Sequence, residues 1–312
     1  FKQELAGYRN QLIQPYLIDK KTEENLIREA YERMKYEVNA SHILISIPAN
    51  ATPEDTLTIY NKTLRIRDRL VGGEQFEVVA RATSDDPSVK RNGGNLGFFS
   101  VFQMVYPFEN AAFNTKVGDI SMPIRTSFGY HIVKVNAKRP NQGQVRAAHI
   151  MIATPPNSSR EQVTQAKTII DSLFKLVRNN EDFAELARKH SQDPGSARNG
   201  GELPWFGTGR MVPEFEKAAF SLQPGQVSEP MQTQFGWHIV KVLEKKGVGS
   251  FEEMLPEIRS RFARDERGRI SKTVFVNQLK AKHSFQLDSS ALKTMAAILD
   301  SSIFTGNWST PR

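Results

Sequence analysis

Two sets of polar side chains in this 312-residue sequence have types and spacings that could support chemistry. Each set has a histidine near the start of a segment, an aspartate two residues after a serine, and a second histidine near the end of the segment. The sets are His42, Asp86 and His131, and His149, Asp193 and His238. Two imidazoles and a carboxylate can form a buried hydrogen-bonded network, bind a metal, transfer protons or set the polarity of a cleft.

Three interpretations of these sets remain to be weighed. Alternation along a strand places His131 on the same face as Val133 and Val135, and His42 on the face of Ala40, so a pair of buried histidines that satisfy each other is the simplest one. A zinc site is disfavoured, because the residues lack HExxH-like spacing. A Ser-His-Asp hydrolase is disfavoured further, because no G-x-S-x-G motif is present and each histidine lies in a predicted strand.

An apolar set accompanies the polar one. It consists of Leu96, Phe99, Met104 and Phe108, with Leu203, Phe206, Met211 and Phe215 at the equivalent positions. Such residues usually belong to a core. Here they follow glycine-rich stretches at 92–94 and 199–201 and exceed what a small core needs, which predicts a concave apolar pocket with few polar groups at its rim.

These side chains recur because a whole segment recurs. Val38–Val135 aligns with Val145–Val242 without a gap, at a constant offset of 107 residues. Each segment has the size of a domain, so the sequence predicts two copies of one domain and not a solenoid. The short linker Arg139–Gly143 between them is rich in turn-forming residues.

Each copy predicts the element order strand, helix, helix, loop, helix, strand, strand. Thr52 with Asp55, and Ser159 with Gln162, form predicted capping boxes at the start of the first helix. This order is typical of a small α+β domain with an antiparallel sheet and surrounding helices. The predicted boundaries are 1–36 for a helical N-terminal segment, 37–138 and 144–246 for copy one and copy two, and 247–312 for a helical C-terminal segment.

Helical stripes flank the two copies. The first follows Thr22, the second follows a capping box of Ser250 and Glu253, and the third lies near the C-terminal end. Their members are Leu26, Ile27, Ala30, Tyr31 and Met34; Phe251, Leu255, Ile258 and Phe262; and Leu292, Met295, Ala296 and Leu299. None is wide enough to form a core alone, so the terminal segments are expected to pack on one another or on residues beyond this sequence.

Composition limits the remaining function classes. The absence of cysteine excludes disulfides, Cys-ligated zinc and thiol nucleophiles, and it is compatible with an oxidising compartment. No stretch approaches about 18 consecutive apolar residues, which predicts a soluble chain. The chain starts at Phe1 within a helical pattern, so it is expected to be a fragment whose signal peptide is missing.

The net charge of +8 leaves nucleic acid, membrane surfaces and acidic polypeptides open as partners. A basic run comprises Arg259, Arg261, Arg264, Arg267, Arg269 and Lys272. Because Asp265 and Glu266 interrupt it, the run predicts a solvated helix face, and nucleic acid is not an expected partner. Contact with a membrane stays open.

Both copies resemble parvulin-type peptidyl-prolyl cis-trans isomerase domains. The shared motifs are A-x-H-[IM], S-x-D-P, GG-x-L-x-x-F, M-V-x-x-F-E-x-A-A-F and T-x-F-G-[YW]-H-I-[IV]-K-V, and they span nearly all of each copy. In that family two histidines lie on adjacent strands beneath the cleft, with an Asp or Cys beside them, and Leu, Met and Phe side chains hold the proline ring. By position, the resemblance implies His149, Asp193, His238, His42, Asp86 and His131 as catalytic residues, and Leu203, Phe206, Met211, Phe215, Thr233, Phe235, Leu96, Phe99, Met104, Phe108, Thr126 and Phe128 as substrate-binding residues.

The resemblance also implies a function. It predicts non-covalent rotation about Xaa-Pro bonds, without a metal or cofactor. Substrates should not need a phosphate, because the loops PANATPED and PPNSSREQ lack the Lys/Arg cluster of phospho-specific parvulins. Tandem copies between helical segments are similar to periplasmic chaperone-isomerases of the SurA, PpiC and PrsA kind, which implies a periplasmic location and unfolded or nascent exported, proline-containing polypeptides as partners. The alternative is a polypeptide-binding chaperone in which one or both copies are inactive binding modules.

The two copies differ around the predicted pocket. Gly207 and Gly209 of copy two correspond to Ser100 and Phe102 of copy one. If Gly209 adopts a positive φ, a phenylalanine there is expected to strain the turn or change it. We therefore hypothesise that copy two is the faster isomerase and that copy one favours client binding.

Overall fold

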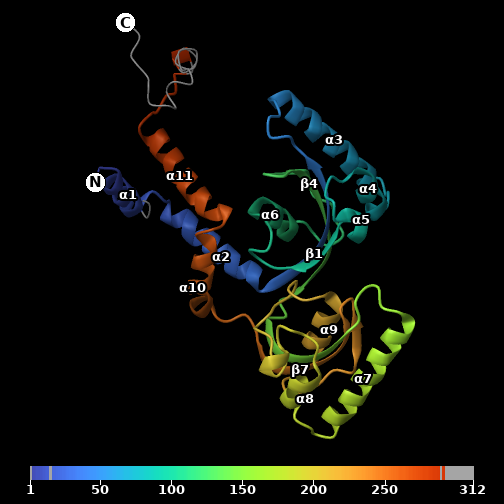
Figure 1. Cartoon of the computed structure of the whole chain (residues 1–312). Coiled ribbons are helices and arrows are strands. Elements are labelled where there is room, and N and C mark those ends of the chain that lie inside the picture. The colour runs from blue at the N-terminus through green and yellow to red at the C-terminus, as the bar shows by residue number, and fades with distance from the viewer. Residues whose placement is uncertain (1, 14–15, 289, 292–312) are drawn as a thin grey trace. The chain divides into compact units, whose positions relative to one another are not determined.

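A computed structural model describes residues 2–13, 16–288 and 290–291 of the chain (Figure 1). It divides into two compact units, one of Phe1–Asn25 with Arg267–Arg312 and one of Leu26–Glu266. The predicted third stripe, Leu292 to Leu299, lies outside the described residues. In the described part of the chain, no helix has both the length and the apolar character needed to cross a membrane.

Copy one is built on a four-stranded antiparallel sheet with the order β2-β1-β4-β3. Its elements, in chain order, are β1 (Tyr36–Ser46), α3 (Pro53–Val71), α4 (Phe76–Thr83), α5 (Val89–Asn92), β2 (Asn95–Phe99), α6 (Tyr106–Asn114), β3 (Ile124–Thr126) and β4 (Gly129–Pro140). The long strands β1 and β4 run side by side along the whole of the sheet. Their pairing decides where the histidines lie.

Copy two repeats this architecture with a three-stranded sheet of order β5-β7-β6. Its elements are β5 (Gln144–Ala153), α7 (Arg160–Arg178), α8 (Phe183–His190), the 3-10 helix η2 (Ala197–Asn199), α9 (Pro213–Ser221), β6 (Met231–Thr233) and β7 (Gly236–Lys246). The counterpart of β2 is reduced to isolated bridges from Val145 to Phe206 and from Ala148 to Glu202. The predicted α+β class with antiparallel sheets is confirmed, but the predicted order omitted β2 and α5.

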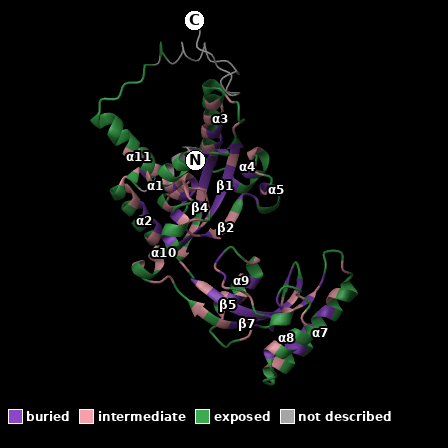
Figure 2. Cartoon of the chain, turned by 60° about the vertical axis from the view of Figure 1, so that its left-hand side comes forward, coloured by how far each residue is buried: buried purple, intermediate pink, exposed green. Residues whose placement is uncertain are grey.

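Each sheet is covered on both faces, and in copy one β1 is buried along most of its length (Figure 2). Ile43 and Ile45 face α3 and α4, whereas Val38 and Ala40 face α6. The same division holds in copy two, where α7 and α8 cover one face and α9 the other. Because side chains alternate across a strand, one buried strand supplies two separate apolar clusters.

Helix starts follow the predicted capping chemistry. The side chains of Thr52, Ser159 and Ser250 each accept a hydrogen bond from the backbone N–H three residues later. The side chain of that later residue in turn accepts a hydrogen bond from the backbone N–H of the Thr or Ser. Such a reciprocal pair satisfies two of the unpaired donors at a helix start. All three predicted capping boxes are therefore confirmed.

The flanking helices are α1 (Lys2–Ile13), α2 (Lys20–Met34), α10 (Phe251–Phe262) and α11 (Glu266–Lys282). Helix α2 starts earlier than predicted, because Asp19 and not Thr22 precedes its first turn and accepts the Thr22 N–H at 2.7 Å. Within the unit of residues 26–266, Tyr31 packs edge-on against Phe251 and donates to the carbonyl of Gly249. In the other unit, Asp19 N–H donates to the carbonyl of Ser271 at 3.1 Å.

The basic run does not form one solvated face. It begins in α10, passes a turn at 263–265 and continues in α11. Arg259, Arg264, Arg269 and Lys272 are exposed, as predicted, but Arg267 is fully buried. Within α11, Arg267 and Ser271 lie on the buried side of the helix, one turn apart, whereas Arg269 and Lys272 lie on the exposed side.

Gly236 provides a test of the strand pairing that holds the site. Its φ is +142°, and a Cβ atom there would lie 2.1 Å from the Ile152 carbonyl oxygen on the neighbouring strand. Gly236→Ala should therefore destabilise copy two by roughly 1–3 kcal/mol, through backbone strain and the clash with β5. Urea unfolding of the full chain measures this change.

Gly247→Ala is the matched control, since no atom lies within 4 Å of its ideal Cβ position and its φ is not in the left-handed region. Its unfolding midpoint should stay close to that of the wild type. An equal loss of stability in both variants would contradict this account of Gly236.

Candidate functional site

The structure brings each predicted pair of histidines together on one face of its sheet. His42 on β1 pairs with Val133, and His131 on β4 pairs with Leu44, so the two rings meet diagonally across neighbouring strands. Their Nδ1 atoms are 3.3 Å apart and the rings are stacked at an interplanar angle of 17°. In copy two His149 and His238 reproduce this contact, also with 3.3 Å between the Nδ1 atoms.

A line of hydrogen bonds extends from the histidine pair in both directions. In copy one, His42 Nε2 lies 2.7 Å from Asp86 Oδ2, and His131 Nε2 lies 2.8 Å from Thr126 Oγ1. Copy two has the same contacts from His149 to Asp193, at 2.8 Å, and from His238 to Thr233, at 2.9 Å. The order Asp, His, His, Thr is therefore common to both copies.

Donors and acceptors determine the direction of this network. Phe128 N–H donates to Thr126 Oγ1, so the threonine hydroxyl is free to donate to His131 Nε2. At the other end the Asp86 carboxylate accepts from His42 Nε2–H, which leaves His42 Nδ1 as an acceptor for His131 Nδ1–H. Both rings are then neutral and each has one defined tautomer.

Burial favours this neutral state. Burial and then the nearby His42 lower the pKa of His131 to about 4, and burial and then His149 lower the pKa of His238 to about 4. Burial also lowers the pKa of His42, although the hydrogen bond to Asp86 acts against it. Near neutral pH the network of copy one thus holds one carboxylate and two uncharged imidazoles.

The carboxylates stay ionised despite partial burial. Burial alone would raise the pKa of Asp86, but hydrogen bonds from Ser88 and His42 outweigh it and the pKa is lowered. For Asp193, burial is outweighed by hydrogen bonds from Ser196, His149 and the Gly195 N–H, and its pKa is also lowered. Each network therefore ends in a fixed negative charge beside a buried imidazole.

Ser196 is a site residue that the sequence interpretation missed. Its hydroxyl is buried, donates to Asp193, and lies 3.0 Å from His149 Nε2. In copy one Ser88 donates to Asp86 and accepts from the Asn92 amide, while Val89 occupies the position equivalent to Ser196. This serine lies in a glycine-rich turn, and only its equivalence to a buried valine could have drawn attention to it.

The apolar candidates form the floor under the imidazoles. Phe108 meets His42 and His131 edge-on at centroid distances of 5.6 and 5.4 Å, and Phe215 meets its histidines in the same way. Phe108 and Phe215 are only 3% and 4% exposed, and Phe99 and Phe206 are as deeply buried. These four phenylalanines therefore act mainly through packing, which excludes water from one side of the rings.

The other apolar candidates lie nearer the surface. Leu96 and Met104 are half-buried against the cluster of copy one, as are Leu203 and Met211 in copy two. Phe128 and Phe235 are 58% and 55% exposed, and their backbone N–H groups rather than their rings join the networks. The structure thus provides an outer layer of Leu, Met and exposed Phe around an inner, buried layer.

The double-glycine motif holds the histidine strand in place. His42 N–H donates to the Gly94 carbonyl and His149 N–H to the Gly201 carbonyl, each at 2.9 Å. A Cβ atom on Gly94 or Gly201 would lie 2.6 or 2.2 Å from the carbonyl oxygen of the same histidine. Only glycine permits this approach, and both glycines have positive φ.

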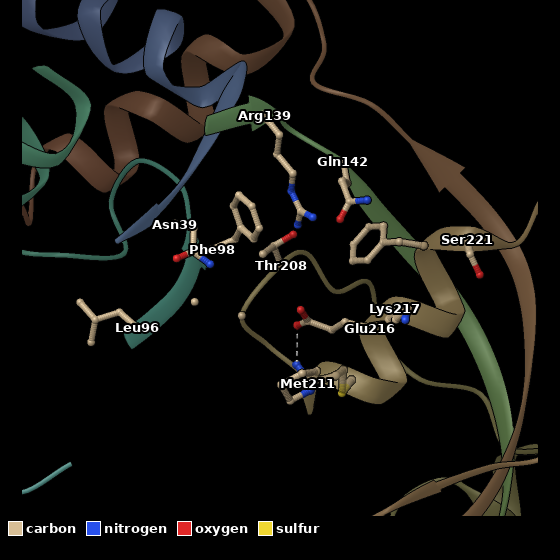
Figure 3. A pocket seen from close by; sticks show the side chains of 14 residues that line it. Asn39, Leu96, Phe98, Arg139, Gln142, Thr208, Met211, Glu216, Lys217 and Ser221 are labelled. Carbon is tan, nitrogen blue, oxygen red and sulfur yellow. Dashed lines mark hydrogen bonds between the residues drawn. The ribbon is translucent and has the colours of Figure 1, made fainter. Parts of the chain in front are cut away.

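A glutamate stabilises the turn before each pocket methionine. In copy two the Glu216 carboxylate accepts from the backbone N–H groups of Arg210 and Met211, at 2.8 and 2.9 Å (Figure 3). In copy one the buried Glu109 accepts from the Phe102 N–H at 2.9 Å. The shared F-E motif contained this residue, but its type alone did not reveal that it supports a loop.

The turn itself is alike in both copies. Gly209 has φ +80°, and Phe102 adopts the same left-handed region with φ +63°. The expectation of a positive φ at Gly209 is confirmed. The left-handed conformation is thus kept in copy one, where it strains a phenylalanine, although the glutamate accepts from Phe102 there and from Arg210 and Met211 in copy two.

A pocket of about 530 Å³ lies beside these turns (Figure 3). Copy two contributes Thr208, Met211 and Glu216 to its wall, and copy one contributes Leu96 and Phe98. Two of the predicted substrate-binding residues, Leu96 and Met211, therefore border open space. Among the described residues, no group of three or more His, Asp or Glu side chains is arranged to hold a metal ion.

The buried imidazoles predict a dependence of stability on pH. An unfolded histidine titrates near 6.5, whereas His131 and His238 titrate at about 4 in the folded chain. Between these values the unfolded chain binds protons that the folded chain does not. The contribution of each imidazole to the free energy of unfolding should therefore be nearly constant above about pH 7.5 and fall by roughly 2.5 kcal/mol on going to pH 4.5.

Urea unfolding of the full chain at pH 7.5, 6.5, 5.5 and 4.5 measures this dependence. The exposed His190 and His283 supply the control, and a His190→Gln, His283→Gln variant should retain the same slope. A slope that disappears in this control variant would assign the effect to the surface and refute the buried-network explanation.

Comparison with known proteins identifies the two copies. Residues 42–137 and residues 135–246 each match the PPIC-type PPIase domain. The chain is 35% identical over 236 residues to Chaperone SurA of Nitrosococcus oceani, which covers 72% of this chain and 54% of the relative. It is 37% identical over 221 residues to Chaperone SurA of Methylococcus capsulatus, covering 70% of this chain and 48% of the relative.

The chain spans about half the length of these curated relatives. Among solved structures, PrsA from Bacillus cereus is 21% identical, with 91% of this chain and 89% of that chain covered and a TM-score of 0.32. PrsA from Bacillus anthracis is 28% identical, with 47% and 62% covered and a TM-score of 0.31. The chain thus belongs, through two tandem PPIC-type PPIase domains, to the peptidyl-prolyl isomerase family of that type and is homologous to the SurA chaperones.

Proposed function

We propose that copy two catalyses cis-trans rotation about Xaa-Pro bonds in unfolded polypeptide. The observation that carries this proposal is the hydrogen-bonded network of Asp193, His149, His238 and Thr233, whose histidines are buried and which lies next to an apolar cluster that includes Met211. It offers a dry, polar surface of fixed orientation next to side chains that can hold a proline ring.

The reaction requires no nucleophile. Rotation must disrupt amide resonance against a barrier of about 18–20 kcal/mol, and it moves no proton and forms no covalent bond. An apolar environment disfavours the charge-separated planar amide, while oriented dipoles can stabilise the twisted form. In this proposal Leu203 and Met211 grip the ring from the surface, Phe206 and Phe215 exclude water from below, and the network sets the polarity of the cleft.

We propose a different emphasis for copy one. Its Asp86, His42, His131 and Thr126 network is complete, but the turn before Met104 places a phenylalanine in the left-handed region. Strain of this kind costs on the order of 1 kcal/mol per residue. Copy one accordingly acts more as a binding module for apolar peptide than as a fast isomerase.

For the whole protein we propose a folding chaperone that acts on exported, proline-containing polypeptides in the periplasm. The relatives carry the name chaperone, and a solved structure of two SurA-like chaperones describes one of them, Cj1289, as a periplasmic protein. The strand-to-helix loops 48–55 and 155–162 have no cluster of Lys and Arg, which supports substrates without phosphate. A chaperone in which neither copy turns over is the alternative that the experiments below decide.

The first test compares matched methionines in the full chain. Burying a Met side chain is worth about 1.5–3 kcal/mol, so Met211→Ala should lower kcat/KM for an unphosphorylated Leu-Pro peptide by about tenfold. Met104→Ala should have a smaller effect if copy two is the main isomerase. NMR exchange spectroscopy between the cis and trans forms of the peptide gives the rates directly.

Circular dichroism and urea unfolding verify that both variants stay folded. Aggregation of an unfolded client is followed in parallel, to separate turnover from binding. Wild-type exchange no faster than the uncatalysed reaction, combined with suppression of aggregation, would sink the isomerase proposal and favour the chaperone alternative.

The second test exchanges the residue at the positive-φ position. Phe102→Gly should relieve the turn and raise the kcat/KM of copy one, whereas Gly209→Phe should lower that of copy two, each by a few-fold for a strain of about 1 kcal/mol. Each variant is measured with the other copy weakened by its Met→Ala substitution. Ser100→Gly in the same loop is the control, because neither Ser100 nor its counterpart Gly207 has a positive φ. Unchanged kcat/KM values for Phe102→Gly and Gly209→Phe would show that the residue at this turn position does not make the two copies unequal as isomerases.

A further inference from the structure

Arg33 of helix α2 is a buried cation that packs against copy one. The guanidinium of Arg33, near the end of α2, is only 8% exposed and lies 5.7 Å from the Tyr106 ring centroid and 5.5 Å from that of Phe113. Its Nη1 donates to Glu109 at 3.0 Å and its Nη2 to Asn110 at 2.6 Å. Arg33 Nη2 also pairs with Glu29 of α2 itself at 2.8 Å, but the other partners all belong to α6, so Arg33 fixes α2 to the helix that follows the methionine loop.

Glu109 connects this cation to the loop. One carboxylate oxygen accepts from Arg33, and the other accepts from the Phe102 N–H at 2.9 Å. The Glu109 side chain is completely buried, so its charge depends on these partners. A continuous line of contacts thus leads from α2 through Glu109 to the strained residue two positions before Met104.

Copy two has the same loop without this link. Glu216 accepts from the Arg210 and Met211 N–H groups, is half-buried, and forms no ion pair with a Lys or Arg among the described residues. Its loop has glycine where copy one has Phe102. The two loops are therefore supported by equivalent carboxylates, but only the carboxylate of copy one is held by a residue outside the repeat.

We propose that Arg33 is a positioning residue for the peptide-binding loop of copy one, through which α2 sets the affinity of that copy alone. This inference rests on the proposed function in that Met104 contacts peptide. The left-handed conformation of Phe102 persists because Glu109 accepts its N–H while Arg33 holds Glu109 in place. Without Arg33 the carboxylate loses its charge partner and the loop is free to relax.

A full chain labelled with ¹³C at its methionine methyl groups separates the two copies, because Met104 and Met211 each report on one loop. The probe is an unphosphorylated tetrapeptide with a central Leu-Pro bond. Arg33→Met should shift the Met104 methyl resonance without peptide and weaken the Kd obtained from that resonance by about tenfold, within the range of ordinary coupling between sites. The Kd obtained from Met211 should not change.

Two further variants keep the test decisive if Arg33→Met unfolds. Arg33→Met with Glu109→Gln removes the uncompensated charge, so it should fold while the link stays broken and the affinity stays low. Arg33→Lys retains the charge and should recover part of the affinity. Lys35→Met is the control, because Lys35 pairs with Glu32 on the surface beside α2 and has no bond to α6.

The results separate the two proposals. A weaker Kd at Met104 with an unchanged Kd at Met211 supports the role of Arg33. Equal affinities at Met104 in the wild type and the double variant overturn it, as does an equal loss at both methionines. If the peptide moves neither resonance in the wild type, the proposed binding function fails, and the shift of the free Met104 resonance in the double variant still decides whether Arg33 positions the loop.

Discussion

The contact between two Nδ1 atoms at 3.3 Å constrains everything around it. Two ring nitrogens can face each other at this distance only if one carries a proton and the other does not. Protonating His42 at Nδ1 would replace this hydrogen bond by repulsion between two N–H donors, in a site that burial already makes hostile to charge. The surrounding structure must therefore hold the two rings in one orientation and shield them from water.

Each neighbouring element meets one part of that requirement. Antiparallel pairing of β1 with β4, and of β5 with β7, brings the histidines onto one face at diagonal positions. The second glycine of each loop admits the carbonyl contact that fixes the histidine strand. The phenylalanine of α6 or α9 closes the apolar side, and the aspartate and threonine end the network with an acceptor and a donor. Replacing Val89 by Ser196 between the copies leaves this pattern intact.

Much of this could be predicted from the sequence, because it follows from local patterns and from the repeat. Alternation placed His42 and His131 on apolar faces, and the offset of 107 residues paired each aspartate, histidine and threonine of one network with a counterpart in the other. Three features could not be predicted in this way. The burial of Phe108 depends on how α6 packs, β2 depends on a pairing partner far along the chain, and the contact of Arg33 with Glu109 joins residues 76 positions apart that no periodicity relates. Whether the site residues are catalytic also lies beyond pattern alone.

The inner network and the outer loop have changed to different extents between the copies, and the reason is physical. A substitution within the network leaves a buried polar atom without its partner, a cost that one neighbouring change rarely offsets. The methionine loop lies at the surface, where a strained Phe102 can be held by one carboxylate and a cation from another helix. The two copies of the domain therefore keep the same inner network, while their methionine loops are free to differ. In copy one the methionine loop is joined through Glu109 to Arg33 of α2, so under the proposed function a residue outside the repeat sets how that loop holds peptide.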